Sequence, residues 1–176
     1  MNIAKNIEAC LERVKLLALD VDGVLTDGGL YYSNSGEELK KFNVKDGQGI
    51  KLVMQSGVEV AIISANNSAA TLHRARKLGI ERAFVGIENK LATLEKICQE
   101  LNLSLERVAY VGDDLNDLPV LQAVGCPLTV ADAIPENKAS AVYVTKSKGG
   151  QGCVREICNL LLQVRTRNKI LLTNEQ

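Results

Sequence analysis

Short apolar runs alternate along the chain with segments whose apolar residues recur every three or four positions. Most of the runs lack polar alternation, so we predict strands buried on both faces at residues 14–20, 58–63, 82–86, 107–112, 127–131 and 141–144. The helical spacing lies between them, at residues 46–57, 66–79, 88–102 and 116–125. Because strands joined by single helices become parallel neighbours, the pattern predicts an α/β fold with three α/β/α layers around a doubly wound, mostly parallel sheet.

Two segments depart from this alternation. Residues 28–45 carry turn-forming residues at 33–36 between stretches of alternating polarity, which predicts a small β-hairpin insertion. The glycine-rich segment 146–152 is predicted to be a flexible loop before a final helix over 153–165, followed by a loosely ordered polar tail over 166–176. Since no repeat or linker divides the chain, we expect one domain over residues 1–176, with its core at about 14–165.

The predicted hairpin gathers aromatic and basic side chains in a chain with only 3% aromatic residues. Tyr31, Tyr32 and Phe42 would form an exposed aromatic ribbon, which suits a subunit interface better than an isolated hairpin in water. Lys40, Lys41 and Lys45 could attract an anionic substrate, although a run of solvated charges is the more common explanation.

Composition narrows the class of function. The 21 basic residues balance the 21 acidic ones and are scattered, which argues against binding to nucleic acid or to an anionic membrane. No apolar run reaches the roughly 18 residues of a membrane span, and the charged start is unlike a signal peptide, so we expect a cytoplasmic protein. The five cysteines form no metal-binding pair and are expected to be reduced, buried thiols. With a single histidine, catalysis has to use carboxylates, lysine or hydroxyls.

The strongest chemical signal is a pair of carboxylates, Asp20 and Asp22, directly after the first apolar run. Both would emerge at the carboxyl edge of the sheet, where ligands bind in open α/β folds. An aspartate can attack phosphorus, and a second acid two residues on can protonate the leaving oxygen and then activate water. The alternative is that both residues only stabilise the turn at Gly23.

A second acidic cluster, GDDLND, follows another apolar run and opens a helix, where it is also typical of a helix N-cap. Two acidic clusters at neighbouring strand ends would repel each other unless a divalent cation lay between them, and oxygen ligands favour Mg²⁺. Asp117 is expected to orient Lys90 or the waters of the metal, and Asp114 to cap the helix or approach the metal. Ser64 and Lys90 follow the next strands and could stabilise phosphoryl oxygens, although each alone is more often a helix cap or a solvated lysine.

A carboxylate pair, a hydroxyl, a lysine and an acidic cluster follow one another along the chain, and in this order of motifs the chain resembles the haloacid dehalogenase superfamily of phosphatases. The four motifs are DVDGVLT at 20–26, Ser64, Lys90 and GDDLND at 112–117. From Val14 to the final helix, the chain is similar to the small capless sugar-acid phosphatases, with supporting stretches FNVKDGQGIK and KGGQGCVREICNLLL. The resemblance implies a Rossmann-like core without a large cap domain, and a Mg²⁺-dependent phosphomonoesterase that forms an aspartyl-phosphate.

The resemblance also implies roles for individual residues. Asp20 would be the nucleophile, Asp22 the general acid and base, and Ser64 and Lys90 would stabilise the phosphoryl oxygens. Mg²⁺ would be held by the carboxylates of Asp20 and Asp113 and by the backbone carbonyl of Asp22. The residues expected to contact the substrate are Asp22, Asn43, Val44, Lys45, Asp46, Gly47, Lys51, Asn66, Arg74 and Lys90. Family members of this type are homotetramers, in which the hairpin and the C-terminal tail of one subunit cover a neighbour's site.

Two positions depart from the family pattern. Members acting on the eight-carbon ester 3-deoxy-D-manno-octulosonate 8-phosphate typically carry arginine where this chain has Asn66 and Gln151. Each change removes a guanidinium that could bind the carboxylate of the substrate. We expect the eight-carbon ester as the substrate, and a nine-carbon, sialic-acid-like 9-phosphate is the alternative. A phospho-accepting signalling domain and an inactive oligomeric scaffold are the alternatives of other classes.

Overall fold

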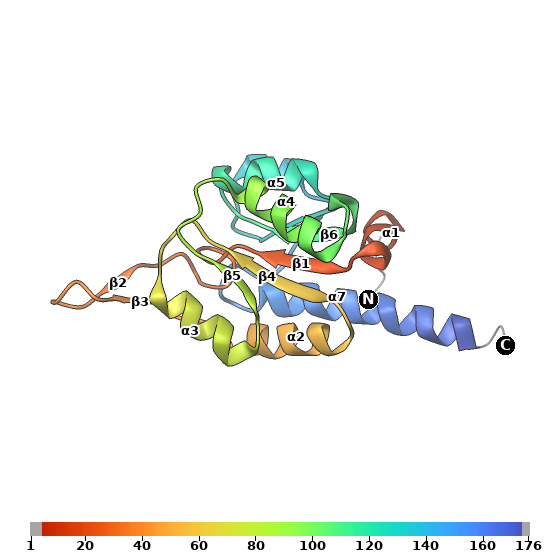
Figure 1. The fold of residues 1–176 in the computed structure, drawn as a ribbon, viewed down its shortest axis with the longest axis horizontal. Coiled ribbons are helices and arrows are strands. Elements are labelled where there is room, and N and C mark those ends of the chain that lie inside the picture. Colours follow the sequence, from red (N-terminus) through yellow and green to blue (C-terminus); the bar gives the residue numbers. More distant parts are fainter. Residues whose placement is uncertain (1–4, 174–176) are drawn as a thin grey trace.

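A six-stranded parallel sheet lies at the centre of the structure, a computed structural model that describes residues 5–173 (Figure 1). Its strands follow the order β5-β4-β1-β6-β7-β8, and each neighbouring pair is parallel. The strands are β1 (Leu16–Leu19), β4 (Glu59–Ile63), β5 (Arg82–Phe84), β6 (Val108–Val111), β7 (Cys126–Thr129) and β8 (Tyr143–Val144). Each of the six predicted runs overlaps one of these strands, so the predicted sheet is confirmed.

Helices cover both faces of the sheet, which confirms the three-layer α/β/α class. The helices are α1 (Lys5–Arg13), α2 (Val44–Gln55), α3 (Ala69–Leu78), α4 (Lys90–Leu101), α5 (Leu118–Ala123), α6 (Pro135–Ser140) and α7 (Cys153–Thr173). Residues of α1, α2, α3 and α7 pack on one face, and residues of α4 and α5 pack on the other (Figure 1). The sequence did not predict α1 or the short α6.

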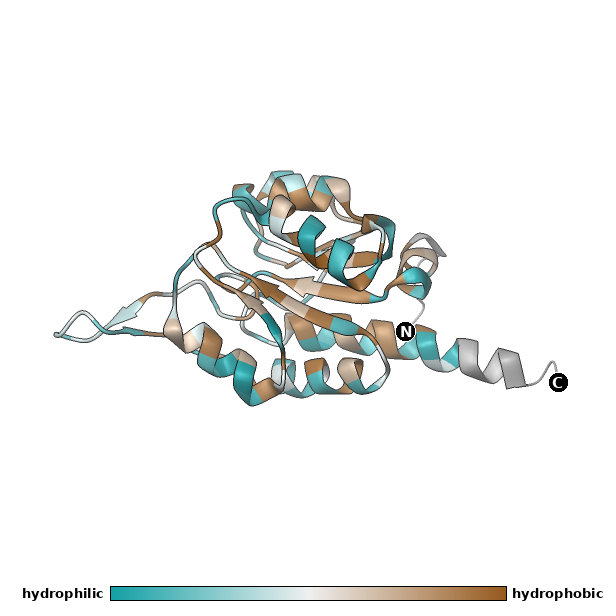
Figure 2. Cartoon of the chain, viewed as in Figure 1, coloured by the Kyte–Doolittle hydropathy of each residue, from teal (hydrophilic) through white to brown (hydrophobic). Residues whose placement is uncertain are grey.

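The central strand β1 shows why the strand pattern is apolar without alternation. Leu17 and Leu19 enter the core on the side of α2 and α7, whereas Leu16 and Ala18 enter the core on the side of α4. Burying each leucine contributes about 1.5–3 kcal/mol. Figure 2 shows that the residues along the central strands are mostly apolar. Since the strands are covered on both faces, polar side chains emerge at their ends.

The predicted hairpin is confirmed as the antiparallel pair β2 (Tyr31–Tyr32) and β3 (Glu38–Leu39). It lies between β1 and α2 in the sequence and projects from the body of the protein (Figure 1). Its turn includes Gly36, whose φ of 81° favours glycine. Tyr31 and Tyr32 are exposed, as predicted, whereas Phe42 packs against the core.

The glycine-rich segment 146–152 packs closely against the turn that follows β1. A Cβ on Gly149 would lie 1.9 Å from the carbonyl oxygen of Gly23, so only glycine permits this close approach. The backbone N–H of Gly150 donates to the carbonyl oxygen of Val24 at 2.9 Å. The helix α7 continues to Thr173, through most of the segment that was expected to be a loose tail, and residues 174–176 lie outside the described residues.

The side chains of Cys10 of α1 and Cys126 of β7 lie next to each other, with Cα atoms 5.4 Å apart. The two residues are 116 positions apart, and only the packing of α1 beside β7 brings them together. Cys98, Cys153 and Cys158 are buried free thiols, as predicted. Within residues 5–173, none of the helices has the length and apolar character to cross a membrane.

Candidate active site

A hollow of about 180 Å³ lies where β1, β4 and β6 end. The residues that line it are Asp20, Asp22, Ser64, Ala65, Asn66, Asp113, Asp114 and Asn116. The backbone N–H of Asp20 donates to the carbonyl oxygen of Val111 at 3.0 Å, which fixes the end of β1 beside the end of β6. The shared edge of a parallel sheet thus brings together two acidic segments that are about ninety residues apart, as the sequence predicted.

Four buried side chains, which we call the inner cluster, form the floor of this site: Asp20, Lys90, Tyr110 and Asp117. The Nζ atom of Lys90 lies 2.9 Å from Oδ1 of Asp20 and 2.7 Å from Oδ1 of Asp117. The hydroxyl of Tyr110 donates to the same Asp117 oxygen at 2.5 Å. The other oxygen, Oδ2, accepts the backbone N–H of Asp113 at 3.0 Å. The predicted contact between Asp117 and Lys90 is confirmed, whereas Tyr110 was not identified from the sequence.

Negative charge dominates the site and shifts the pKa of its acids. Burial, together with the charge of Asp117, raises the pKa of Asp20 to about 7, against the opposing effect of Lys90. Burial, together with the charges of Asp20 and Asp117, raises the pKa of Asp113 to about 8. Burial alone would lower the pKa of Lys90, but attraction to Asp20 and Asp117 raises it. Three carboxylates facing one ammonium leave an excess of negative charge that favours a bound cation.

The residues present fit a divalent metal ion. Carboxylate oxygens of Asp20, Asp113 and Asp117 lie within 4.8 Å of one another. Oδ1 of Asp113 is buried and has no hydrogen-bond partner in the structure. A Cβ on Gly23 would lie 2.0 Å from Oδ2 of Asp113, so glycine lets the chain approach this carboxylate. Both Asp117 oxygens already accept hydrogen bonds, and an oxygen-only donor set favours Mg²⁺.

A second group of side chains, which we call the rim network, lies at the edge of the hollow: Asp22, Glu38, Lys40 and Asn66. Lys40 follows β3 and forms an ion pair with Oδ1 of Asp22. Its Nζ atom also lies 3.4 Å from Oε1 of Glu38, whose two carboxylate oxygens accept from Nδ2 of Asn66 at 3.4 and 3.3 Å. The Lys40 side chain is only 1% exposed, so the interpretation as a solvated charge was wrong for this residue.

Ser64 is positioned to donate a hydrogen bond into the hollow. Its backbone N–H donates to the carbonyl oxygen of Phe84 at 2.9 Å, and its own carbonyl oxygen accepts from Ile87 at 3.0 Å. These bonds to the neighbouring strand fix the residue, whereas its buried hydroxyl has no partner in the structure. Asp114 caps the short helix Leu115–Asp117 through its Oδ1, which accepts the N–H of Leu115 at 2.7 Å, and it also lines the hollow.

Several residues expected to contact the substrate lie elsewhere in this chain. Val44, Gly47, Lys51 and Arg74 line a separate hollow of about 150 Å³ between α2 and α3. There the Nη2 atom of Arg74 donates to the carbonyl oxygen of Asn43 at 3.1 Å. The structure therefore does not bring these side chains to Asp20 within one chain.

Other residues of the same predicted loop support the backbone. Oδ1 of Asn43 accepts the N–H of Lys45 at 2.8 Å and caps α2, while the Lys45 side chain is exposed. Asp46 is buried, and its Oδ1 accepts the N–H of Arg155 at 2.7 Å, which joins α2 to the start of α7. Gln151 is exposed and is not among the residues that line the hollow.

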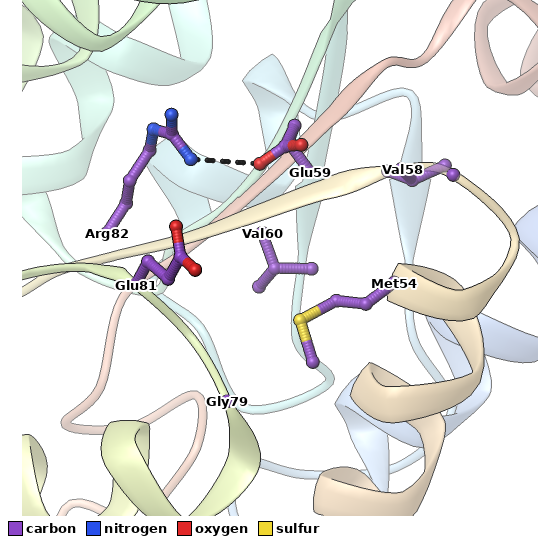
Figure 3. A pocket seen from close by; sticks show the side chains of 8 residues that line it. Met54, Val58, Glu59, Val60, Gly79, Glu81 and Arg82 are labelled. Carbon is purple, nitrogen blue, oxygen red and sulfur yellow. Dashed lines mark hydrogen bonds and ion pairs between the residues drawn. The ribbon is translucent and has the colours of Figure 1, made fainter.

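A hollow of about 230 Å³ lies at the opposite edge of the sheet, where β4 and β5 begin (Figure 3). Its charged residues are Glu59, Glu81 and Arg82, and Arg82 pairs with Glu59 at 2.9 Å. Met54 and Val60 supply apolar surface. This hollow is the larger of the two, but the described residues that line it include neither a buried nucleophile nor the group of three acids found at Asp20, so the site at Asp20 is the candidate active site.

Comparison with known proteins gives consistent matches. Residues 87–157 match the haloacid dehalogenase-like hydrolase family. The 3-deoxy-D-manno-octulosonate 8-phosphate phosphatase KdsC of Escherichia coli is 47% identical over 160 residues, which span 91% of this chain and 85% of that protein. The crystal structure of the Yersinia pestis phosphatase of the same name has a TM-score of 0.91 at 43% identity and covers 93% of this chain and 89% of that one.

A structure of the Moraxella catarrhalis phosphatase of the same name, in complex with a magnesium ion, a phosphate ion and a KDO molecule, is also similar. It has a TM-score of 0.92 at 36% identity and covers 99% of this chain and 100% of that one.

Proposed function

Since the chain belongs to the 3-deoxy-D-manno-octulosonate 8-phosphate phosphatase family of haloacid dehalogenase-like hydrolases, we propose that it hydrolyses that sugar-acid phosphate at the hollow beside Asp20. Membership of this family makes the chain a phosphoric monoester hydrolase. The observation that carries the proposal is the inner cluster, in which the buried Lys90 pairs with the Asp20 carboxylate at the carboxyl end of β1. The adjacent unpartnered oxygen of Asp113 suits the metal that such chemistry requires.

Asp20 is the nucleophile in this proposal. Lys90 holds one oxygen of its carboxylate at 2.9 Å, and the other oxygen attacks phosphorus to form an aspartyl-phosphate. The Lys90 ammonium and the free hydroxyl of Ser64 stabilise the charge on the phosphoryl oxygens. Mg²⁺, held by the carboxylates of Asp20 and Asp113 and the carbonyl of Asp22, would neutralise the negative charge of the site and favour the ionised nucleophile.

Asp22 is the general acid and base. Its carboxyl group donates a proton to the leaving sugar oxygen as the phosphorus–oxygen bond breaks. It then accepts a proton from the water that attacks the aspartyl-phosphate, so inorganic phosphate leaves and Asp20 is regenerated. Asp22 lines the hollow and is 30% exposed, so both a sugar and a water molecule can reach it.

The sugar acid is recognised at the rim of the hollow. Asn66 lies beside Asp22 there and presents an amide to the substrate, while Glu38 accepts from the same amide. An amide binds a carboxylate with less charge assistance than arginine does. The nine-carbon 9-phosphate therefore belongs in any test beside the eight-carbon ester.

Assembly with neighbouring subunits completes the site in our proposal, as a homotetramer. Leu30, Tyr31, Tyr32 and Leu39 of the hairpin are about half exposed or more, which supports burial against another subunit. A lidless hollow also needs a cover that excludes water during phosphoryl transfer. The mass of the purified protein, measured by light scattering, tests this part. Four chain masses support it, and a monomer with full activity contradicts it.

Phosphate release from a panel of esters tests the reaction and the substrate. The panel contains the eight-carbon and nine-carbon sugar-acid phosphates, a hexose phosphate and a pentose phosphate, each with Mg²⁺ and again with EDTA. A marked preference for the eight-carbon ester, lost with EDTA, is expected. Preference for the nine-carbon ester would contradict the proposed substrate and identify the nine-carbon ester in its place. Folded protein without activity on any ester would overturn the proposal.

A further inference from the structure

The Asp22 carboxylate differs from the other acids of the site in how it is held. Asp20 and Asp117 are held by Lys90, which belongs to the core. Within the described part of the chain, the one hydrogen-bond partner of the Asp22 side chain is Lys40, which follows the second strand of the hairpin. The position of this carboxylate therefore depends on a residue outside the sheet.

Lys40 itself is held by the rim network. Its side chain is 1% exposed, and a buried ammonium is costly unless charged partners surround it. Asp22 and Glu38 are those partners, and Asn66 in turn donates to Glu38. The network therefore connects the turn after β1, the hairpin and the segment after β4. Each contact restricts the ammonium, so Lys40 is a rigid support and not a mobile surface lysine.

We propose that Lys40 is a positioning residue that holds the Asp22 carboxylate in the orientation required for proton transfer. This inference rests on the proposed function, in which Asp22 is the general acid and base. An aspartate side chain that is 30% exposed has several rotamers open to it, and proton transfer requires hydrogen-bond contact with the leaving oxygen. Misplacement by about 1 Å can reduce a rate by about 100-fold.

The neighbouring lysine provides a matched control. Lys41 forms an ion pair with Asp27 at the same base of the hairpin, but its side chain is 62% exposed, and neither Lys41 nor Asp27 lines the hollow. If the lysines only anchored the hairpin, removing either ion pair would have similar consequences. If Lys40 acts through Asp22, only its replacement changes proton transfer.

The test compares two kinds of leaving group. Sugar alkoxides need a proton from the general acid, whereas p-nitrophenolate leaves without one. In Lys40→Met, kcat/KM for the sugar phosphate that the wild type hydrolyses fastest should fall by about 30-fold to 100-fold. For p-nitrophenyl phosphate it should fall by less than about fivefold, because attack by Asp20 is retained. Lys41→Met should change neither value by more than about twofold, and Lys40→Arg should restore part of the loss.

The outcomes separate this inference from the proposed function. Equal losses on both esters in Lys40→Met, or no loss on either, would overturn the positioning role while the phosphatase remains. If Lys40→Met fails to fold, the same comparison is made with Lys40→Arg. Its longer, planar cation also displaces Asp22 and should lower kcat/KM for the sugar ester more than for the aryl ester. A wild-type protein that hydrolyses neither ester would overturn the proposed function, and this inference with it.

Discussion

The inner cluster and the rim network are both built from carboxylates and a buried lysine, but different parts of the fold hold them. Lys90, Tyr110 and Asp117 belong to core elements, and each is at most 2% exposed. The rim network instead depends on Glu38 and Lys40, which come from a projecting hairpin. In the function that we propose, the sheet therefore fixes the charges around phosphorus, while the hairpin positions the general acid and base.

Charge balance also distinguishes the two groups. In the inner cluster and its neighbour Asp113, carboxylates exceed the one lysine, and burial raises the pKa of Asp20 and Asp113. At the rim, Lys40 lies between Asp22 and Glu38, and water reaches Asp22. The excess of negative charge in the inner cluster thus favours a bound cation, whereas the charges of the rim network are more nearly balanced.

The largest effect is expected from removing the nucleophile. Asp20→Asn should lower turnover by at least about 10⁴-fold, because a carboxamide cannot form the aspartyl-phosphate. The variant should remain folded in EDTA, since the change removes a charge that burial disfavours. Phosphate release and thermal unfolding measure the two effects, and retention of most activity would contradict the assignment of Asp20.

Replacing the central lysine should disrupt the inner cluster next. Lys90→Met leaves Asp20 and Asp117 buried beside each other without their cation. Turnover should fall by about 10²–10³-fold, and the free energy of unfolding by about 3–5 kcal/mol. Urea unfolding and phosphate release measure both, with Lys41→Met as the exposed control. If Lys90→Met has normal stability, the ion pairs of Lys90 with Asp20 and Asp117 do not stabilise the inner cluster.

Metal dependence should follow pH with a definite sign. The pKa values of Asp20, about 7, and Asp113, about 8, lie above their values in the unfolded chain. In EDTA, the free energy of unfolding of the protein should therefore fall as pH rises from about 4 to 8. Because Mg²⁺ binds the ionised carboxylates, the rise in Tm that it causes should be larger at pH 8.5 than at pH 5.5. Asp113→Asn should abolish most of this rise, and a rise independent of pH would contradict the ligand set.

The smallest change is expected at the rim. Asn66→Arg places a guanidinium at the hollow and should lower KM for the eight-carbon ester by about tenfold, as one charge-assisted hydrogen bond would. Gln151→Arg is the matched control, since Gln151 does not line the hollow of its own chain. If both variants have the same KM, the carboxylate of the sugar is recognised elsewhere.

The residues of the inner cluster were largely predictable from the sequence. Asp20 and Asp113 follow apolar strands that are buried on both faces, and Lys90 opens the helix after the next strand. The predicted contact of Asp117 with Lys90 followed from the same reasoning. Tyr110 was not identified, because a tyrosine inside an apolar strand gives no sign of the side to which its hydroxyl points.

The residues of the rim network were harder to identify. The return path of the hairpin decides that Lys40 pairs with Asp22 while Lys41 pairs with Asp27, and alternating polarity does not specify that path. Asp46 was expected at the substrate and instead accepts from the backbone of Arg155, because the packing of α2 on α7 brings them together.

The sequence by itself determined the parallel sheet, the order in which the acids, the serine and the lysine follow its strands, and the edge at which the acids meet. These features depend on strand periodicity and on the connections between parallel strands, which are properties of local segments. Only the tertiary structure decided the pairing of Lys40 with Asp22, the separation of Arg74 from the hollow and the proximity of Cys10 to Cys126. These contacts join segments that are distant along the chain, and the packing of the whole fold selects which side chains become neighbours.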